Sequence, residues 1–322
     1  MYTYTKTPIN LFHIIITLLL ATQVTQANMP YDKKVYTTPQ KDLNLDLRIS
    51  LGLLTGEANE YVYHPEAQHT ASQLIWNIDS QTMLGLGASL HLTPNFIINT
   101  DFFFSVEDGK SKLTNYDWQL LGEDWTDRSI HNSTDITNAY MIDVNAEYIT
   151  YKDPSISLSL LAGYKEDSFQ WKAYGGEYIY SNEFFRDTTG NFIDSQLGIS
   201  YEQIWSAAYF GLKMKSNFGK LNFNTKVIYS PLAKATATDN HYLRYLRVVD
   251  SFKKDTLFGI DLGIGYAYNE HLHISADYRY QKYDTVTGDS QWNDNGTIYY
   301  LDGYAGADLK TSSFFLKFQY TF

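Results

Sequence analysis

The feature that most constrains this chain is the strict alternation of side chains over residues 311–322. Every second residue is apolar, in the series Phe314, Leu316, Phe318, Tyr320 and Phe322. Phe315 is the one exception between them. Because successive residues of a strand point to opposite faces, the segment presents one wholly apolar face. Such a face favours aggregation on a soluble edge strand, whereas a transmembrane barrel needs it to close against the first strand. An ordinary sandwich strand is the alternative.

The same alternation recurs from Leu43 to the end of the chain. Apolar rows run over residues 43–53, 84–92, 96–106, 142–148, 156–164, 260–266 and 272–280. The second strand is expected to begin at about Glu60. Tight turns follow at residues 93–95, 152–154, 217–219 and 269–270, and two of them contain proline, which cannot continue a hydrogen-bonded ladder. The pattern predicts an all-β fold, a ten-stranded antiparallel transmembrane β-barrel.

Since all the tight turns fall at one end, the long segments fall at the other, as the extracellular loops of outer-membrane barrels do. The expected loops are residues 54–60, 107–137, 172–194, 232–241 and 284–310. A scaffold this regular leaves its specific chemistry to loops and rim. We therefore expect the functional site at that end.

Composition agrees with a barrel. The 322 residues include 28 Tyr and 18 Phe, yet only 44% are hydrophobic and the mean hydropathy is negative, which is too polar for a helical membrane protein. The chain contains no Cys, so it has no disulfide or thiolate site. The net charge of -11 argues against a nucleic-acid partner and is compatible with cationic substrates. No metal site is expected.

The amino-terminal region predicts export. Lys6 precedes an apolar run over residues 11–21, and small residues follow at 25–27, so residues 1–27 are expected to be a signal peptide cleaved after Ala27 or Ala21. The run is too short to span a bilayer as a helix. Residues 28–322 are then expected to form a single outer-membrane β-barrel domain.

The predicted inward face carries both signs of charge. Its members are Asp46, Arg48, Asp101, Asp143, Glu147, Lys226, Asp261, Asp277 and Arg279. A barrel of about ten strands is too narrow for a wide aqueous pore. We therefore predict a packed, salt-bridged lumen rather than a channel.

Two clusters in the predicted loops could perform chemistry. One is Asn115-Tyr116-Asp117-Trp118, and the other is Asp239-Asn240-His241-Tyr242. An Asp two residues before a His can orient the imidazole ring or raise its basicity. Polar loops also contain Asp and His by chance, so the pattern alone leaves a purely structural role open.

Residues 43–322 resemble the omptin family of bacterial outer-membrane proteases. The resemblance rests on the order and spacing of Ile49-Ser50-Leu51-Gly52, Ser72-Gln73-Leu74, Trp125-Thr126-Asp127, Leu161-Ala162-Gly163-Tyr164, Gly175-Gly176, Phe185-Arg186-Asp187 and Tyr320-Thr321-Phe322. It implies a barrel with a groove at its rim, where a His-Asp pair and an Asp pair hold the water that attacks the scissile amide. The expected enzyme class is an aspartic-type endopeptidase.

The family's catalytic pattern can be placed residue by residue. The His-Asp pair falls on His241 and Asp239, and the Asp pair falls on Asn115 and Asp117, so one family carboxylate is an amide here. An amide cannot take a proton or carry the charge that orients a water. The resemblance also implies two acids that bind a basic substrate residue. One matches Glu60, and the other falls on Ala237.

The resemblance further implies a lipopolysaccharide site on the outer wall that activity requires. Tyr164, Glu166 and Lys253 match it, whereas the family's two arginines fall on Ser168 and Ile204. Other cations that could take their place are Lys165, Lys172 and Lys254. No other cofactor is expected.

Three functions are compatible with the sequence. The first is an outer-membrane endopeptidase that cleaves peptides or proteins next to basic residues. The second is an omptin-like barrel with little activity that serves as a surface adhesin or binding protein, and the third is a narrow pore or a lipid-modifying barrel. In the first, the protein is expected to be a monomer whose partners are substrates, outer-membrane lipid and lipopolysaccharide.

Overall fold

The computed structural model describes residues 44–64, 69–120 and 122–322, and the predicted signal peptide lies outside these residues. They form one sheet of antiparallel strands. The strands are β1 Leu45–His64, β2 His69–Thr93, β3 Phe96–Ser105, β4 Gly109–Asp117, β5 Asp127–Lys152, β6 Ile156–Tyr174, β7 Glu177–Tyr180, β8 Thr188–Asn191, β9 Leu197–Phe218, β10 Leu221–His241, β11 Leu246–Ala267, β12 Leu272–Asp294 and β13 Thr297–Thr321. A short 3-10 helix, η2 Tyr242–Arg244, joins β10 to β11. The described chain has no helix with the length and hydropathy to cross a membrane.

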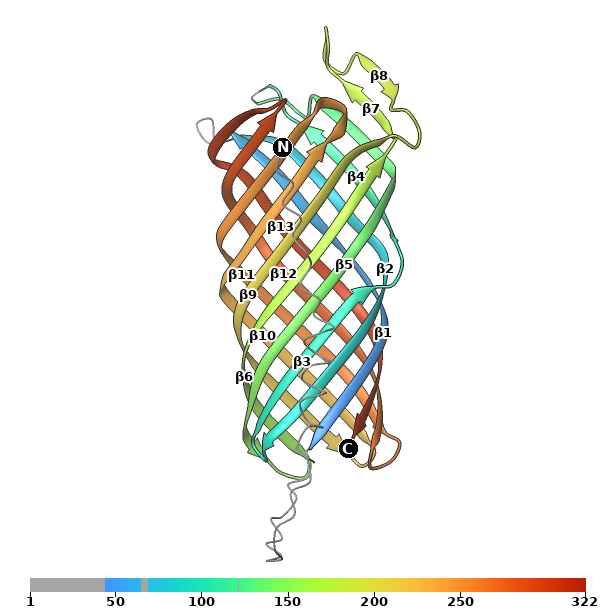
Figure 1. The fold of residues 1–322 in the computed structure, drawn as a ribbon, viewed down its shortest axis with the longest axis vertical. Helices are drawn as coiled ribbons and strands as arrows, with labels where there is room; N and C mark the ends of the chain where they lie inside the picture. Colours follow the sequence, from blue (N-terminus) through green and yellow to red (C-terminus); the bar gives the residue numbers. More distant parts are fainter. Residues whose placement is uncertain (1–43, 65–68, 121) are drawn as a thin grey trace, which may run out of the picture. The chain divides into compact units, whose positions relative to one another are not determined.

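The sheet closes on itself. Pairing runs in the order β3, β2, β1, β13, β12, β11, β10, β9, β6 and β5, and β3 pairs with β5 to complete a ring of ten. β4 continues the line of β3 between β2 and β5. The register of β1 on β13 extends from Asp46 opposite Thr321 to Val62 opposite Ala305. The predicted ten-stranded barrel is confirmed (Figure 1).

An apolar belt surrounds the end of the barrel where the chain finishes. On β1 the exposed side chains are Leu47, Ile49, Leu51 and Leu53, and on β13 they are Phe314, Leu316, Phe318, Tyr320 and Phe322. β7 and β8 extend beyond the opposite end in Figure 1. The alternation in the sequence therefore marks the lipid-facing part of each strand.

The predicted long loops are wrong in most of their length, because the strands continue well past the belt. Residues 54–60 belong to β1, residues 232–241 to β10, and residues 284–310 mostly to β12 and β13. Residues 107–137 include β4, and residues 172–194 include β7 and β8. Glu60 accordingly lies on β1 and not at the start of β2. Beyond the belt both faces of the sheet meet water or protein, so the apolar alternation ends while backbone pairing continues.

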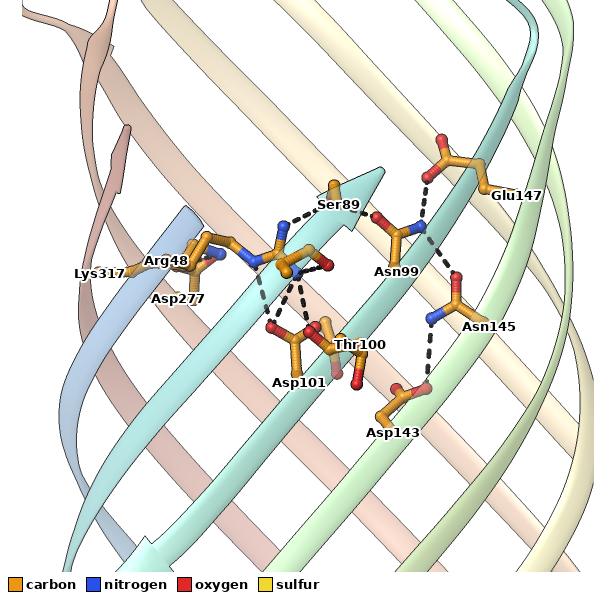
Figure 2. Close-up of polar contacts among 12 residues, drawn as sticks. Arg48, Ser89, Asn99, Thr100, Asp101, Asp143, Asn145, Glu147, Asp277 and Lys317 are labelled. Carbon is orange, nitrogen blue, oxygen red and sulfur yellow. Dashed lines mark hydrogen bonds and ion pairs between the residues drawn. The ribbon is translucent and has the colours of Figure 1, made fainter. Parts of the chain in front are cut away.

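Inside the belt, the lumen carries the predicted network of salt bridges, but it is not packed as predicted, because a cavity of about 460 Å³ lies among these charged side chains. Arg48 pairs with Asp101 at 3.0 Å, and Lys226 pairs with Asp143 at 2.9 Å and with Asp261 at 3.0 Å. Figure 2 shows the Arg48 guanidinium reaching Asp101 of β3, and Asn145 bridging Asp143 to Asn99. Buried charges require such partners.

Phe315, the exception in the terminal strand, points into this lumen and is 2% exposed. Its ring packs on Phe103 at 4.7 Å, and the Arg279 guanidinium lies 4.4 Å from the Phe103 ring centre. Gly52 makes room for it, since a Cβ at that position would lie 2.4 Å from the Phe315 ring. The apolar residue that breaks the alternation is therefore a lumen-packing residue.

An aromatic layer closes the lumen between the charged network and the rim. Trp76 stacks on Tyr201 at 5.2 Å and contacts Trp171 at 6.0 Å, and Trp205 stacks on Tyr283 at 4.6 Å. All five side chains are fully buried. The inward side chains of β1 pass through the same layers. Arg48 lies in the charged network, Leu54 and Ala58 follow in the apolar part of the core, and Glu60 lies toward the rim. The layer forms a rigid floor beneath any site at the rim.

The position of the belt generates a stability prediction. Phe318 lies at the centre of the apolar row on β13, so Phe318→Arg should lower the free energy of unfolding by about 2–4 kcal/mol. Phe318→Leu, which keeps an apolar side chain toward lipid, is the matched control. The measurement is urea unfolding of the refolded barrel in lipid vesicles. Equal losses for the two variants would show that this face does not contact lipid.

Candidate functional site

A cavity of about 420 Å³ opens at the rim, above the aromatic layer and beyond the belt. Its wall includes the predicted functional residues Glu60, Asn115, Asp117, Asp239 and His241. These come from β1, β4 and β10, which are far apart in the sequence. The tertiary structure thus brings the two sequence clusters into one cavity, and all five residues lie on strands.

The Asp239–His241 pair stands at the end of β10. Two residues apart on one strand, the side chains share the inward face, and His241 Nε2 lies 2.6 Å from Asp239 Oδ2. The Asp239 side chain is 2% exposed, and its other oxygen, Oδ1, has no hydrogen-bond donor within reach. This geometry holds the imidazole ring in a fixed orientation with Nε2–H directed at the carboxylate.

Arg244 covers the ring from η2, immediately after β10. Its Nη2 atom lies 3.3 Å from both ring nitrogens of His241, so the guanidinium sits over the ring rather than in its plane. Burial raises the pKa of Asp117, and the positive charge of Arg244 is among the causes that oppose this rise. Arg244 therefore acts on both His241 and Asp117, and no pattern in the sequence pointed to this role.

Asn115 and Asp117 are paired with each other on β4. Asn115 Nδ2 donates a hydrogen bond to Asp117 Oδ2 at 3.1 Å, and Ser72 Oγ donates to Asn115 Oδ1 at 3.1 Å. Burial raises the pKa of Asp117 above its ordinary value, and hydrogen bonds from Ser72 and Asn115 oppose that shift. The amide at position 115 thus stabilises the ionised form of its neighbour.

Glu60 lies at the bottom of the cavity against the aromatic floor. Trp76 Nε1 donates to Glu60 Oε2 at 3.4 Å, and the residue is 3% exposed. Burial raises the pKa of Glu60 well above its ordinary value, and the charges of Asp239 and Asp250 raise it further. A proton on Glu60 would supply the donor that Asp239 Oδ1 lacks. Ala237 is buried on β10 and contributes no polar side-chain atom.

Asp250 is a site residue that the sequence analysis missed. It lies on β11 directly opposite Ala237, lines the cavity and is 4% exposed. Ser290 Oγ donates a hydrogen bond to Asp250 Oδ1. Burial raises the pKa of Asp250 to about 7, with a further contribution from the charge of Asp239 and an opposing one from the Ser290 hydrogen bond. Only the strand register could have pointed to it.

Ser129 and His131 on β5 also line the cavity and were missed. His131 Nδ1 donates to the Gly175 carbonyl, which leaves Nε2 to accept a hydrogen bond from Ser129 Oγ at 3.1 Å. Burial lowers the pKa of His131, and the charge of His241 lowers it further. A neutral imidazole therefore faces the site from this side.

Comparison with known proteins identifies the family. The model of the Omptin family matches residues 41–322. The chain belongs to the omptin family. It is 29% identical to the plasminogen activator of Yersinia pestis over 77% of this chain and 79% of that one. It is 28% identical to the outer membrane protease IcsP of Shigella flexneri over 79% and 84% of the two chains.

The fold agrees with a solved omptin. The crystal structure of outer membrane protease OmpT from Escherichia coli superposes with a TM-score of 0.84 at 25% identity, covering 88% of this chain and 98% of that one. This chain is accordingly an outer-membrane barrel of the omptin family.

The residues that match the omptin lipopolysaccharide site lie on the outer wall in two groups. Tyr164 is exposed on β6, and the Glu166 carboxylate accepts hydrogen bonds from Tyr164 at 3.2 Å and Tyr140 at 2.9 Å. Lys253 is on β11, with β9 and β10 between, and pairs with Asp289 at 3.4 Å. Ser168 is buried, whereas Ile204 is partly exposed.

Of the alternative cations, Lys165 is excluded from that role. It points inward, is 5% exposed and pairs with Asp167 at 2.9 Å, because odd-numbered residues of this part of β6 face the lumen. Lys172 is partly exposed, and Lys254 is exposed beside Lys253.

The buried acids generate a pH prediction. Asp250 holds its proton up to about pH 7 when folded and releases it near pH 4 when unfolded. Between those values the folded state binds more protons, so stability falls as the pH rises. Asp250→Asn should remove part of this fall, of order a few kcal/mol, while Asp289→Asn, at an exposed position, should not. Thermal unfolding in detergent from about pH 4 to about pH 8 measures it. Parallel curves for parent and Asp250→Asn would contradict the prediction.

Proposed function

We propose that this chain is an outer-membrane endopeptidase that hydrolyses peptides or proteins next to basic residues at the cell surface. The observation that carries the proposal is the 2.6 Å contact of His241 with buried Asp239, in the wall of a cavity that Asp117 also lines. Membership of the omptin family and the protease names of its relatives support peptide hydrolysis.

The proposed chemistry uses His241 as general base. Because Nε2–H is donated to Asp239, the lone pair of Nδ1 is available to accept a proton from a water between His241 and Asp117. The water oxygen then attacks the carbonyl carbon and gives a tetrahedral intermediate. As the carbon–nitrogen bond breaks, the imidazolium returns its proton to the leaving amine. The Asp239 carboxylate stabilises the imidazolium through this cycle.

The Asn115–Asp117 pair fits this chemistry through its charge. Two neighbouring carboxyl groups share one proton and carry one negative charge between them. An amide donating to a carboxylate keeps the single negative charge and the hydrogen bond, which is the 3.1 Å contact here, but it offers no second proton acceptor. We propose that Asp117 alone orients the water and that Asn115 holds Asp117 ionised. This keeps the aspartic-type assignment with one carboxylate in place of two.

We further propose that lipopolysaccharide binds on the outer wall and supports activity. The cations best placed for its phosphates are Lys253, whose side chain is 80% exposed, and the neighbouring exposed Lys254. Lys234 on β10 is also exposed and lies opposite Ser206, the residue that is itself opposite Glu166. Charge-assisted bonds to phosphate favour such a group. These three lysines lie on β10 and β11, whereas the two positions where the family has arginine, Ser168 and Ile204, lie on β6 and β9.

The base is tested by substitution. His241→Ala should lower kcat by about 10³-fold on a fluorogenic dibasic peptide, because a positioned general base contributes about 10²–10⁴-fold. His271→Ala, at an exposed turn of the opposite end, is the control and should cleave at the parent rate. The refolded full chain is assayed with added lipopolysaccharide. A parent rate retained in His241→Ala would limit the omptin likeness to the fold and favour the adhesin function.

The amide position is tested by restoring the family residue. Asn115→Asp should raise kcat by about 10² above neutral pH, because a second carboxylate adds a proton acceptor beside the water. Its pH profile should gain an extra titration step, since two carboxylates on one strand face share a proton. Asn115→Ser, which removes the amide without adding charge, is the control. An unchanged rate and profile would mean that the amide already supplies what the reaction needs.

A further inference from the structure

The inference concerns the acid that the family pattern places at position 237 and that this chain lacks. Ala237 lies on β10 and is 2% exposed. On the neighbouring strand, β11, Asp250 stands directly opposite it in register. Residues directly opposite in an antiparallel pair project from the same face, with Cβ atoms about 4.5–5.5 Å apart. A carboxylate at position 250 therefore reaches the corner of the cavity that the alanine leaves open.

Asp250 is supported as a binding group would be. Ser290 Oγ donates to one of its oxygens, and Trp292 Nε1 donates in turn to Ser290 Oγ at 2.8 Å. Both supporting residues lie on β12, the next strand of the barrel, and both line the cavity. This chain of donors fixes the direction of the carboxylate toward the cavity interior.

The acids at this end of the cavity lack a cation. In the described parts of the chain, no Lys, Arg or His forms an ion pair with Glu60 or Asp250, and Asp239 pairs only with His241. Asp239 Oδ1 is buried without a donor. Buried acids without a cation hold their protons more tightly, as the raised pKa values of Glu60 and Asp250 indicate, and a ligand cation would provide the partner for their ionised forms. The aliphatic walls at Val62, Leu74 and Val248 suit the stem of a long side chain.

We infer that Asp250 is a specificity-determining residue which, together with Glu60, binds the guanidinium or ammonium group of the substrate residue next to the scissile bond. An acid on the adjacent strand, opposite position 237 in register, takes the role of the second acid of the pocket. The inference rests on the proposed function and adds to it the residue that selects the substrate.

The protonation of the pocket gives the inference a pH signature. The titratable groups that face Asp250 are Glu60 on β1, Asp239 on β10 and Tyr201 on β9. Because the pKa of Asp250 is raised to about 7, protons compete with a cationic side chain below that pH. Preference for a basic over a neutral residue should therefore increase as the pH rises through about 7.

The test uses the refolded full chain with lipopolysaccharide and peptides that differ only at the residue next to the scissile bond. Asp250→Asn should lower kcat/KM for the Arg peptide by about 10²-fold and lower it far less for the Gln peptide, since removing one partner of a buried charge pair weakens only the binding of the charged side chain. Ala237→Asp in the Asp250→Asn background should restore the Arg preference. Asp302→Asn, at an exposed position on β13 outside the cavity wall, is the matched control. An unchanged ratio of Arg to Gln rates in Asp250→Asn overturns the inference.

A second measurement separates this inference from the proposed function. Binding of p-aminobenzamidine, a fluorescent mimic of the arginine side chain, is titrated against parent and Asp250→Asn. Weaker binding by the variant supports the pocket even if the parent hydrolyses no peptide, in which case the proposed function alone fails. Equal binding, or no binding by either protein, overturns the inference. Retention of the folded, heat-modifiable gel mobility shows that each variant has the barrel.

Discussion

Closure of the backbone hydrogen-bond ladder is the constraint on which the rest of this structure depends. In hydrocarbon an unpaired amide or carbonyl costs several kcal/mol, so a sheet can cross a bilayer only as a ring without edges. Here β1 pairs with β13 and β3 pairs with β5, which completes that ring. Once the ring is closed, alternate residues of each strand are divided between lipid and lumen, and the apolar belt and the charged lumen follow.

The same ring explains why the site is rigid. The strands continue beyond the belt, so Glu60, Asp117 and Asp239 are held by backbone pairing on both sides rather than by loops. Beneath them, Trp76, Tyr201 and their neighbours form an aromatic floor whose side chains are fully buried from solvent. Side chains on paired strands keep their separation, which the proposed proton transfer through one water requires.

Among the described residues, charged side chains of the lumen form ion pairs, whereas two of the acids at the rim do not. In the lumen, Arg48 and Lys226 are paired with Asp101 and Asp143, so the charges there balance one another. At the rim, Glu60 and Asp250 are buried acids without a cation among the described residues, and burial raises the pKa of each. Balanced charge stabilises the scaffold, whereas the acids at the rim are the groups with which the proposed substrate cation would pair.

The sequence by itself determined the barrel and its lipid-facing rows, since strand periodicity is a local property that residues such as Leu316 and Phe318 display directly. It also determined the Asp239–His241 pair, because two residues apart on one strand must share a face. Only the tertiary structure decided that Glu60 belongs to β1, that Lys165 is buried against Asp167, and that Asp250 stands opposite Ala237. These depend on strand length beyond the belt and on register between strands, and neither leaves a periodic trace in the chain, because packing against other strands sets both.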